Sequence, residues 1–336
     1  MSVRVFLLLI LMPTLVLLHL FPFLPRRGRL FGIAVPPAVR YGAQGAQLLR
    51  HYQLSLLPWT AGAALIGLRF ASEARLAILM MVLPLPSLIA ATWLFYQGRS
   101  AARPFALPAS PVHEVQLTDA GDRLGLRLLW FLPPFGLLGA AALYLHANWD
   151  RIPARFAIHW DLNGHPNGWS HRSAGGVYGP LILAALIVLF LLVMAMLTYR
   201  GSRRGTQRAA AFIVMTAVSY LMALVFSMAA LSPFWAPQPW AVFGVILAFL
   251  VVIGLLVVRA YSQPEPEGAS AERTPEECWH AGDFYYNPND PALFVEKRVG
   301  IGFTFNFGNR VSWVILGASV LFIAGLVVLV PRLIGH

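Results

Sequence analysis

The sequence predicts an all-α polytopic membrane protein with about eight transmembrane helices and small extramembrane loops that resemble β-hairpins. Hydrophobic residues make up 58% of the 336-residue chain and charged residues only 12%, whereas soluble domains carry about 25% charged residues. The mean hydropathy is +0.67. A soluble globule cannot hide this much apolar surface, so a soluble enzyme, a disordered chain and a secreted disulfide scaffold are excluded. The single cysteine, Cys278, also excludes an internal disulfide.

Eight apolar segments approach the roughly 20 residues that a helix needs to cross the hydrocarbon core. We read them as helices, because a helix satisfies its own backbone hydrogen bonds inside lipid. In chain order they cover residues 5–23, 54–68, 76–96, 128–146, 177–197, 209–231, 240–258 and 311–330, the second being short. The first four contain prolines, which predict kinks.

The distribution of basic residues predicts the orientation of these helices. The net charge is +11, and the loops after the first, third, fifth and seventh segments hold 18 of the 25 Arg and Lys residues. Cytoplasmic loops are enriched in Arg and Lys, so both termini are expected on the extracytoplasmic side of the membrane. The charge is thus assigned to orientation and to contact with the lipid bilayer, and nucleic acid is not expected as a partner.

The loop after the fourth segment combines a strand pattern with a group of histidines. Apolar and polar residues alternate from Ile152 to Asp161, and two Asn-Gly turn signals follow at 163–164 and 167–168. Three roles stay open for this loop: metal binding, a structural hydrogen-bonding role, and recognition of a peptide or envelope component outside. The residues proposed for recognition are His159, Asp161, Asn163, Gly164 and Trp169, and the weak zinc candidates are His159, His165 and His171.

The loop after the seventh segment begins with a polar linker and ends in a phenylalanine-rich segment. Strands are expected at 293–298 and 301–307, with Val299 and Gly300 allowing a hairpin. Phe303, Phe305 and Phe307 would then share one face, which must be buried on the helices or in the inner headgroup layer. The residues proposed to bind a cytosolic protein are Asn287, Asp290, Lys297, Arg298 and Asn306. Asp290 has no paired base or nucleophile, so no catalytic residue and no cofactor are assigned.

Both loops resemble parts of a known family. The segment IPARFAIHWDLNGHPNGW is similar to the signature of a domain of unknown function found in SdpI-like bacterial membrane proteins, with the recurring positions at Pro153, His159, Gly164 and Trp169. The second loop resembles a companion uncharacterised domain. Its matching positions are Trp279, Gly282, Tyr286, Asn287, Asp290, Pro291, Phe294, Val295, Lys297, Arg298, Gly300, Gly302, Asn306 and Gly308.

This resemblance implies a location in a bacterial cytoplasmic (inner) membrane. It also implies an immunity or signalling role, because the best-understood relative protects its producer from a secreted peptide toxin and signals to a repressor. The present chain differs from that short relative in having more helices and an extra cytoplasmic segment. We expect a four-helix membrane region at 1–146, the signature loop and following helix at 147–199, two further helices at 200–258, the cytoplasmic linker and hairpin at 259–310, and a last helix at 311–336.

Three functions remain open at this stage. The first is a receptor, immunity or signalling protein of the cell envelope, which is not an enzyme. The second is a transporter or permeation pathway, which the lack of charged residues in the middle of the segments disfavours. The third is a membrane-embedded metal-dependent hydrolase, which the lack of an established zinc-ligand spacing disfavours.

Overall fold

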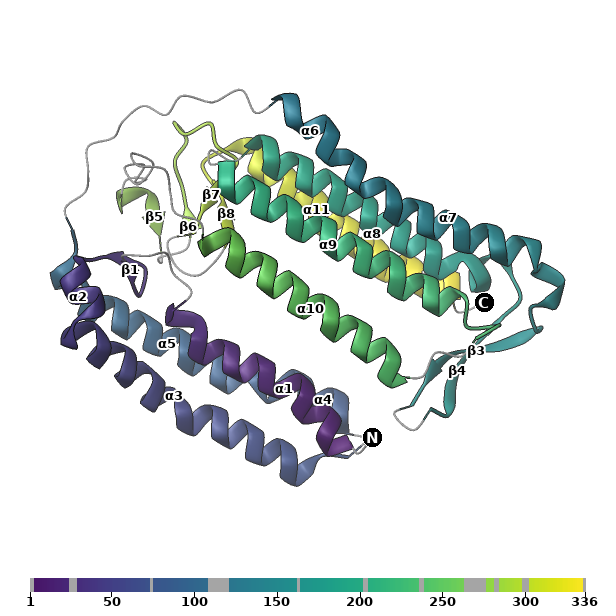
Figure 1. The fold of residues 1–336 in the computed structure, drawn as a ribbon, viewed down its shortest axis with the longest axis horizontal. Helices are drawn as coiled ribbons and strands as arrows, with labels where there is room; N and C mark the ends of the chain where they lie inside the picture. The colour runs from purple at the N-terminus through teal and green to yellow at the C-terminus, as the bar shows by residue number, and fades with distance from the viewer. Residues whose placement is uncertain are drawn as a thin grey trace. The chain divides into compact units, whose positions relative to one another are not determined.

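The computed structural model describes residues 3–23, 29–72, 75–107, 121–161, 164–201, 205–235, 239–262, 276–280, 284–297 and 302–334. Helices dominate these ranges (Figure 1). They are α1 Val3–Leu20, α2 Pro37–Tyr41, α3 Ala43–Phe70, α4 Leu76–Val82, α5 Pro84–Ala102, α6 Gly121–Leu128, α7 Leu132–Ala147, α8 Ala174–Gly201, α9 Gly205–Ala230, α10 Pro239–Ser262 and α11 Arg310–Ile334.

The described strands are short and pair in chain order. They are β1 Arg29–Leu30 with β2 Ile33–Ala34, β3 Arg155–Trp160 with β4 Pro166–His171, β5 Trp279–His280 with β6 Phe284–Tyr285, and β7 Phe294–Glu296 with β8 Phe303–Phe305. The expected strand pair in the phenylalanine-rich segment is therefore present, although the predicted turn residues Val299 and Gly300 lie outside the described residues.

Six helices are long and apolar enough to cross a membrane within the described residues. They span Val3–Phe23, Ile78–Phe105, Leu124–Ala147, Ala174–Gly201, Ala210–Ala230 and Arg310–Leu329. The all-α polytopic membrane fold is thereby confirmed, but the count of eight is not. The predicted segment 54–68 belongs to α3, a 28-residue helix of mixed polarity, and the described apolar part of α10 is the shorter stretch Ala241–Leu256.

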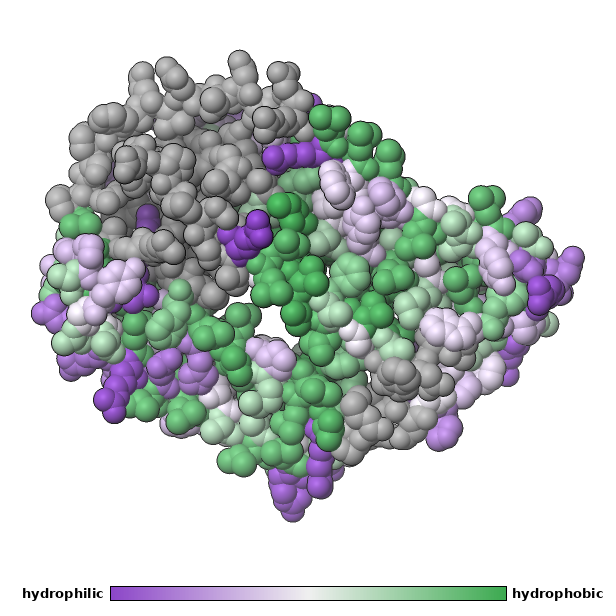
Figure 2. All heavy atoms as spheres, in the orientation of Figure 1, coloured by the Kyte–Doolittle hydropathy of each residue, from purple (hydrophilic) through white to green (hydrophobic). Residues whose placement is uncertain are grey.

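On the face shown in Figure 2, apolar side chains cover most of the visible helix surface, and hydrophilic ones gather mainly toward the helix ends. Leu321 is 74% exposed, and Met81 and Leu143 are each 71% exposed. Water would make such surfaces an aggregation liability. Lipid is the solvent that this surface suits.

The chain divides into two compact units. The first comprises Met1–His113, Ala271–Asp283 and Glu296–Phe303, and the second Glu114–Ser270, Phe284–Val295 and Thr304–His336. In the first unit, α1, α3 and α5 pack against one another. Proline sets one break there: α4 ends at Val82, and α5 begins at Pro84, because a proline cannot continue the hydrogen-bonding of the preceding turn.

A buried turn lies at the centre of the first unit. Phe31, at the tip of the β1–β2 pair, is 0% exposed and has a φ of 48°, a left-handed conformation that non-glycine residues rarely adopt. Its ring lies so close to Gly98 that a Cβ on this glycine would be 2.7 Å from the nearest ring carbons. The Arg99 guanidinium donates a hydrogen bond to the Phe31 carbonyl (3.5 Å). The packed helices therefore hold the strained turn in place.

In the second unit, α8 and α9 form the central pair, with α7, α10 and α11 against them. Small residues allow this close approach: Ala184, Val188 and Ala195 of α8 and Ala223 of α9 are completely buried. The β3–β4 pair immediately precedes the first turn of α8. At the last residue of α8, the carbonyl of Gly201 accepts a hydrogen bond from the Leu293 backbone (3.1 Å). The two loops singled out in the sequence thus lie at opposite ends of α8 (Figure 1).

Candidate functional site

The β3–β4 pair, which we call the signature hairpin (residues 155–171), is anchored by one buried face. Phe156 is 5% exposed and Ser170, its partner across the pair, is 2% exposed. Phe156 belongs to an apolar cluster with Leu145 of α7, Val177 of α8 and Ala230 of α9. The hairpin is therefore an ordered extension of the helix core, as the alternating sequence predicts.

Arginine and serine side chains fix both ends of the anchored region. Arg172 donates to the carbonyls of Asp150 and Ile152, each at 3.2 Å. Ser232, just beyond α9, donates its hydroxyl to the carbonyl of Ala157 (3.1 Å). Reasoning from the sequence missed Ser232, because the serine lies 75 residues from its acceptor and no local pattern connects the two.

The turn of the signature hairpin contains two polar pairs. Asp161 accepts hydrogen bonds from the His165 backbone (2.8 Å) and lies 3.2 Å from its ring Nδ1. His159 pairs through its Nδ1 with the Asn167 side-chain oxygen. Gly164 has a φ of 87°, as the first Asn-Gly turn signal requires. Asn163 lies outside the described residues.

The second Asn-Gly signal is not a turn, which corrects the sequence prediction. Asn167 and Gly168 lie within β4, and the register is irregular on both sides of the His159–Gly168 pair. A Cβ on Gly168 would lie 2.7 Å from the His159 Cβ. The glycine is thus needed for close approach between strands rather than for a chain reversal.

The histidines of this loop do not converge. His165 is held by Asp161 and His159 by Asn167, while His171 lies opposite Arg155. Among the described residues there is no group of three or more His, Cys, Asp or Glu side chains that could hold a metal ion. The weak zinc candidates His159, His165 and His171 therefore lack the convergent geometry that zinc needs.

The outward face of the signature hairpin combines a cation with an aromatic ring. The Arg155 guanidinium lies over the Trp169 ring, 4.7 Å from its centroid, a favourable cation–π geometry. Trp169 is 45% exposed, and His159 and His171 are exposed on the same strands. This surface can bind a partner through stacking, charge and hydrogen bonds.

The second loop is built around a buried polar cluster formed by Tyr285, Asn287, Asp290 and Asn306. Asn306 is 0% exposed, Tyr285 1% and Asp290 4%. Asn306 accepts from the backbone N–H groups of Asn287 and Gly308 (both 3.0 Å) and donates to the carbonyls of Asn287 and Asp290 (both 2.9 Å). Asp290 accepts from the Tyr285 hydroxyl and from the Ala292 backbone, both at 2.9 Å.

This burial differs from the expected alternation, in which the phenylalanines turn inward and the small polar residues turn outward. Phe303, Phe305 and Phe307 are only half-buried, while Asn306 is completely enclosed. The phenylalanines instead form a ring cluster, with Phe305 5.0 Å from Phe294 and Phe307 5.4 Å from Trp313 between centroids. Asn306 is enclosed because its side-chain amide bonds to four backbone groups around it, those of Asn287 (N–H and C=O), Gly308 (N–H) and Asp290 (C=O), which an apolar side chain could not satisfy.

The other predicted binding residues of this loop lie at the strand pair. The Lys297 backbone donates to the Gly302 carbonyl (3.0 Å) and closes the β7–β8 turn, where Gly302 has a φ of 107°. Lys297 is half-buried, Asn287 is half-buried, and Arg298 lies outside the described residues. Asp290 and Asn306 are buried, and their side chains hydrogen-bond to other groups of the same loop. They would therefore support a partner-binding surface by fixing the shape of the loop.

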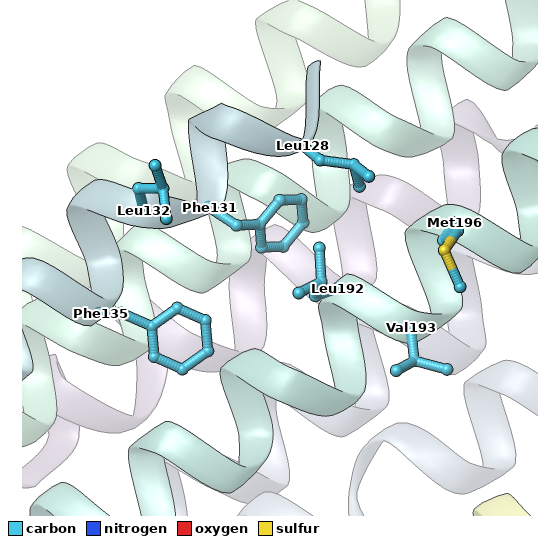
Figure 3. A pocket seen from close by; sticks show the side chains of 7 residues that line it. All are labelled: Leu128, Phe131, Leu132, Phe135, Leu192, Val193 and Met196. Atoms are coloured by element: carbon cyan, nitrogen blue, oxygen red, sulfur yellow. The ribbon is translucent and has the colours of Figure 1, made fainter. Parts of the chain in front are cut away.

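An apolar groove runs between the α6–α7 region and α8 (Figure 3). It is lined by Leu128, Phe131, Leu132, Phe135, Leu192, Val193 and Met196. The groove brings no polar side chain to orient a substrate, and its walls belong to helices that are apolar enough to face lipid. An acyl chain fits its chemistry better than a polar substrate.

Two family models match the chain, one at each loop. Residues 136–184, which include the signature hairpin, match a domain of unknown function, DUF1648. Residues 288–313, which include Asp290 and Asn306, match a family of unknown function, DUF5808. No curated protein and no solved structure matches the chain.

Proposed function

We propose that this multi-pass membrane protein is a receptor or immunity protein of the bacterial cytoplasmic membrane, related to the SdpI-like proteins. The signature hairpin would recognise a peptide or envelope component outside, and the loop around the polar cluster would contact a cytosolic protein. The observation that carries the proposal is the anchoring of the hairpin: one face is buried with α7, α8 and α9, and the other presents Arg155, His159 and Trp169 to solvent. Rigid scaffolds that display exposed polar and aromatic residues are typical of recognition sites.

The arrangement of α8 supports a signalling role in particular. Its first turn packs against the hairpin, where a Cβ on Gly176 would lie 2.3 Å from the His171 carbonyl oxygen. At its last residue, the carbonyl of Gly201 is bonded to Leu293, next to the polar cluster. In this proposal, a ligand that shifts the hairpin would also shift α8, and α8 would transmit the movement to the loop around the polar cluster.

The test is a survival assay in a sensitive bacterial host. Cells that express the protein are challenged with a panel of envelope-active peptides and compared with cells that carry an empty vector. We expect protection against at least one peptide, and loss of this protection in Trp169→Ala and His159→Ala.

Leu143→Ala is the matched control, because Leu143 is exposed on α7 and distant in sequence from the hairpin turn. Membrane levels of each variant are measured by immunoblot. Absence of protection against every peptide, or equal loss of protection in the Leu143→Ala control, would contradict the proposed function.

A further inference from the structure

The two outer edges of the signature hairpin differ. On the β3 edge, the carbonyl of Ala157 is already occupied by the Ser232 hydroxyl at 3.1 Å. The segment that follows α9 therefore already occupies an outward-facing acceptor of the β3 edge. Recognition through backbone hydrogen bonds is left to the β4 edge.

The register shows which β4 groups point outward. The Arg172 backbone donates to the Ala154 carbonyl (3.0 Å), and the next opposed pairs are Arg155 with His171, Phe156 with Ser170, and Ala157 with Trp169. Antiparallel pairs alternate between hydrogen-bonded and non-hydrogen-bonded. The Ala157–Trp169 pair is therefore non-hydrogen-bonded, and both residues direct their backbone N–H and C=O groups away from the partner strand.

The position of Ser232 is consistent with this assignment, since its hydroxyl reaches the Ala157 carbonyl from outside the pair. On the other side, within the described part of the chain, no hydrogen bond from outside the hairpin reaches the backbone groups of Trp169. Unpaired edge groups of this kind are a template for another strand.

One arginine side chain, that of Arg155, brings a positive charge to this edge. Arg155 stacks on Trp169 and lies directly opposite His171. The other nearby arginines are engaged, Arg151 with the Asn148 side chain and Arg172 with two backbone carbonyls. Of the nearby carboxylates, Asp161 is held at His165. A negative charge brought to the β4 edge would therefore meet Arg155.

We propose that an extended peptide with an acidic side chain adds as a third strand to the outer edge of β4. Its backbone would bond to the N–H and C=O of Trp169, and its carboxylate would reach Arg155. This mode of recognition, β-strand addition, takes affinity from main-chain hydrogen bonds and specificity from side chains. The inference rests on the proposed function and specifies the partner of the same hairpin.

The edge is short, which limits the length of segment that it can bind. Pro166, at the start of β4, has no N–H, and the His171 carbonyl accepts from Ser173 at 2.8 Å. The β4 edge can therefore bind only a few residues of an extended peptide, centred on the backbone groups of Trp169.

The experiment uses the full-length protein in lipid nanodiscs and fluorescein-labelled nonapeptides of alternating Thr and Val with a central Glu. Binding is measured by fluorescence anisotropy. Two further probes carry N-methyl groups on alternate amides, so that each blocks a different edge of the added strand. We expect one N-methylated probe to bind about tenfold more weakly than the parent, and the other to bind like the parent.

The charge contribution is tested with a probe in which the central Glu is replaced by Gln. We expect the Glu probe to bind about two- to fivefold more tightly than the Gln probe, the range of an exposed ion pair. This preference should vanish in Arg155→Gln and persist in Arg155→Lys. It should also persist in Arg151→Gln, the matched control that removes the same charge from a neighbouring position.

The proposal is overturned if no saturable binding is seen up to about 1 mM probe, if both N-methylated probes bind alike, or if Arg151→Gln abolishes the Glu preference as Arg155→Gln does. The survival assay reads the proposed function separately. Protection that depends on Trp169 without edge-specific binding would retain the receptor and reject strand addition. Edge-specific binding without protection would do the reverse.

Discussion

The Asn306 side chain makes four hydrogen bonds to backbone groups of the second loop, and its replacement tests what the loop needs. Asn306→Leu keeps the approximate volume but leaves two backbone N–H groups and two carbonyls without the bonds that they now make to this side chain. Of these four bonds, the one to the Asp290 carbonyl is buried and the others are partly exposed, so water can satisfy part of what is lost. Each unsatisfied buried group costs about 1–3 kcal/mol. We expect a loss of about 2–4 kcal/mol in the free energy of unfolding, measured by urea titration in detergent.

Asn289→Ala is the control for this change, because Asn289 is an exposed residue of the same loop. It should alter the unfolding free energy by less than about 0.5 kcal/mol. Equal effects of the two substitutions would show that the loop is not held by the Asn306 amide.

Gly168 provides a second test at the residue scale. In Gly168→Ala the new methyl group meets the His159 Cβ at 2.7 Å, so the strands must separate, and we expect the melting temperature to fall by several degrees. Gly139→Ala, in α7, meets nothing within 4 Å and should be neutral or stabilising, because alanine favours helix. Circular dichroism melts of both variants make the comparison, and a smaller loss for Gly168→Ala than for Gly139→Ala would contradict the close approach.

Individual side chains also mark the boundary of what the sequence could predict. The alternation from Ile152 to Asp161 predicted β3, because the period of a strand is local. The alternation at 301–308 misled at Asn306, which is buried because its side chain bonds to backbone groups of Asn287, Asp290 and Gly308. A pattern of polar and apolar residues does not show which distant backbone groups a side chain will meet in the fold. The role of Ser232 was hidden for the same reason.

At the scale of elements, the β7–β8 pair should contribute to the stability of the whole protein through the ring contacts that connect it to α11. Phe305 contacts Phe294 and Phe307, and Phe307 contacts Trp313 of α11. Phe305→Asp brings a carboxylate into this ring cluster, and we expect a lower melting temperature in detergent, where no bilayer remains. Phe305→Leu, which keeps an apolar side chain, should lose about 1 kcal/mol or less. Unchanged melting of Phe305→Asp would indicate that the rings face lipid instead.

The helices show how far hydropathy alone defines an element. All eight predicted segments fall on helices, because each is a continuous apolar run flanked by polar or turn-forming residues. Hydropathy missed the true length of α3, whose first half carries Arg50 and His51. It also gave no sign of the β1–β2 turn, since Phe31-Gly32 is not one of the usual turn sequences.

At the scale of the whole molecule, the testable statement is the orientation in the membrane. Basic loop residues predict both termini outside, with the signature hairpin outside and Cys278 inside. Native Cys278 should be protected from a membrane-impermeant maleimide in intact cells and should react after the membrane is permeabilised. In a Cys278→Ser background, His165→Cys should react without permeabilisation, because the His165 side chain is 79% exposed. The opposite pattern would reverse the orientation.

The enclosed Phe31 turn has a consequence for biogenesis. Its ring packs against Tyr52 and Phe95 and lies over Gly98, so the pocket that receives it is completed only by α5. A ribosome must therefore synthesise residues well beyond α1 before this turn can seat, and until then the left-handed backbone of Phe31 has nothing to hold it. We expect α1 to be inserted in the membrane before the Phe31 turn has packed, and the turn to pack only after the last turns of α5 leave the translocon. Nascent chains truncated before Gly98 should thus be cleaved near Phe31 by an added protease, and chains that extend past α5 should be resistant.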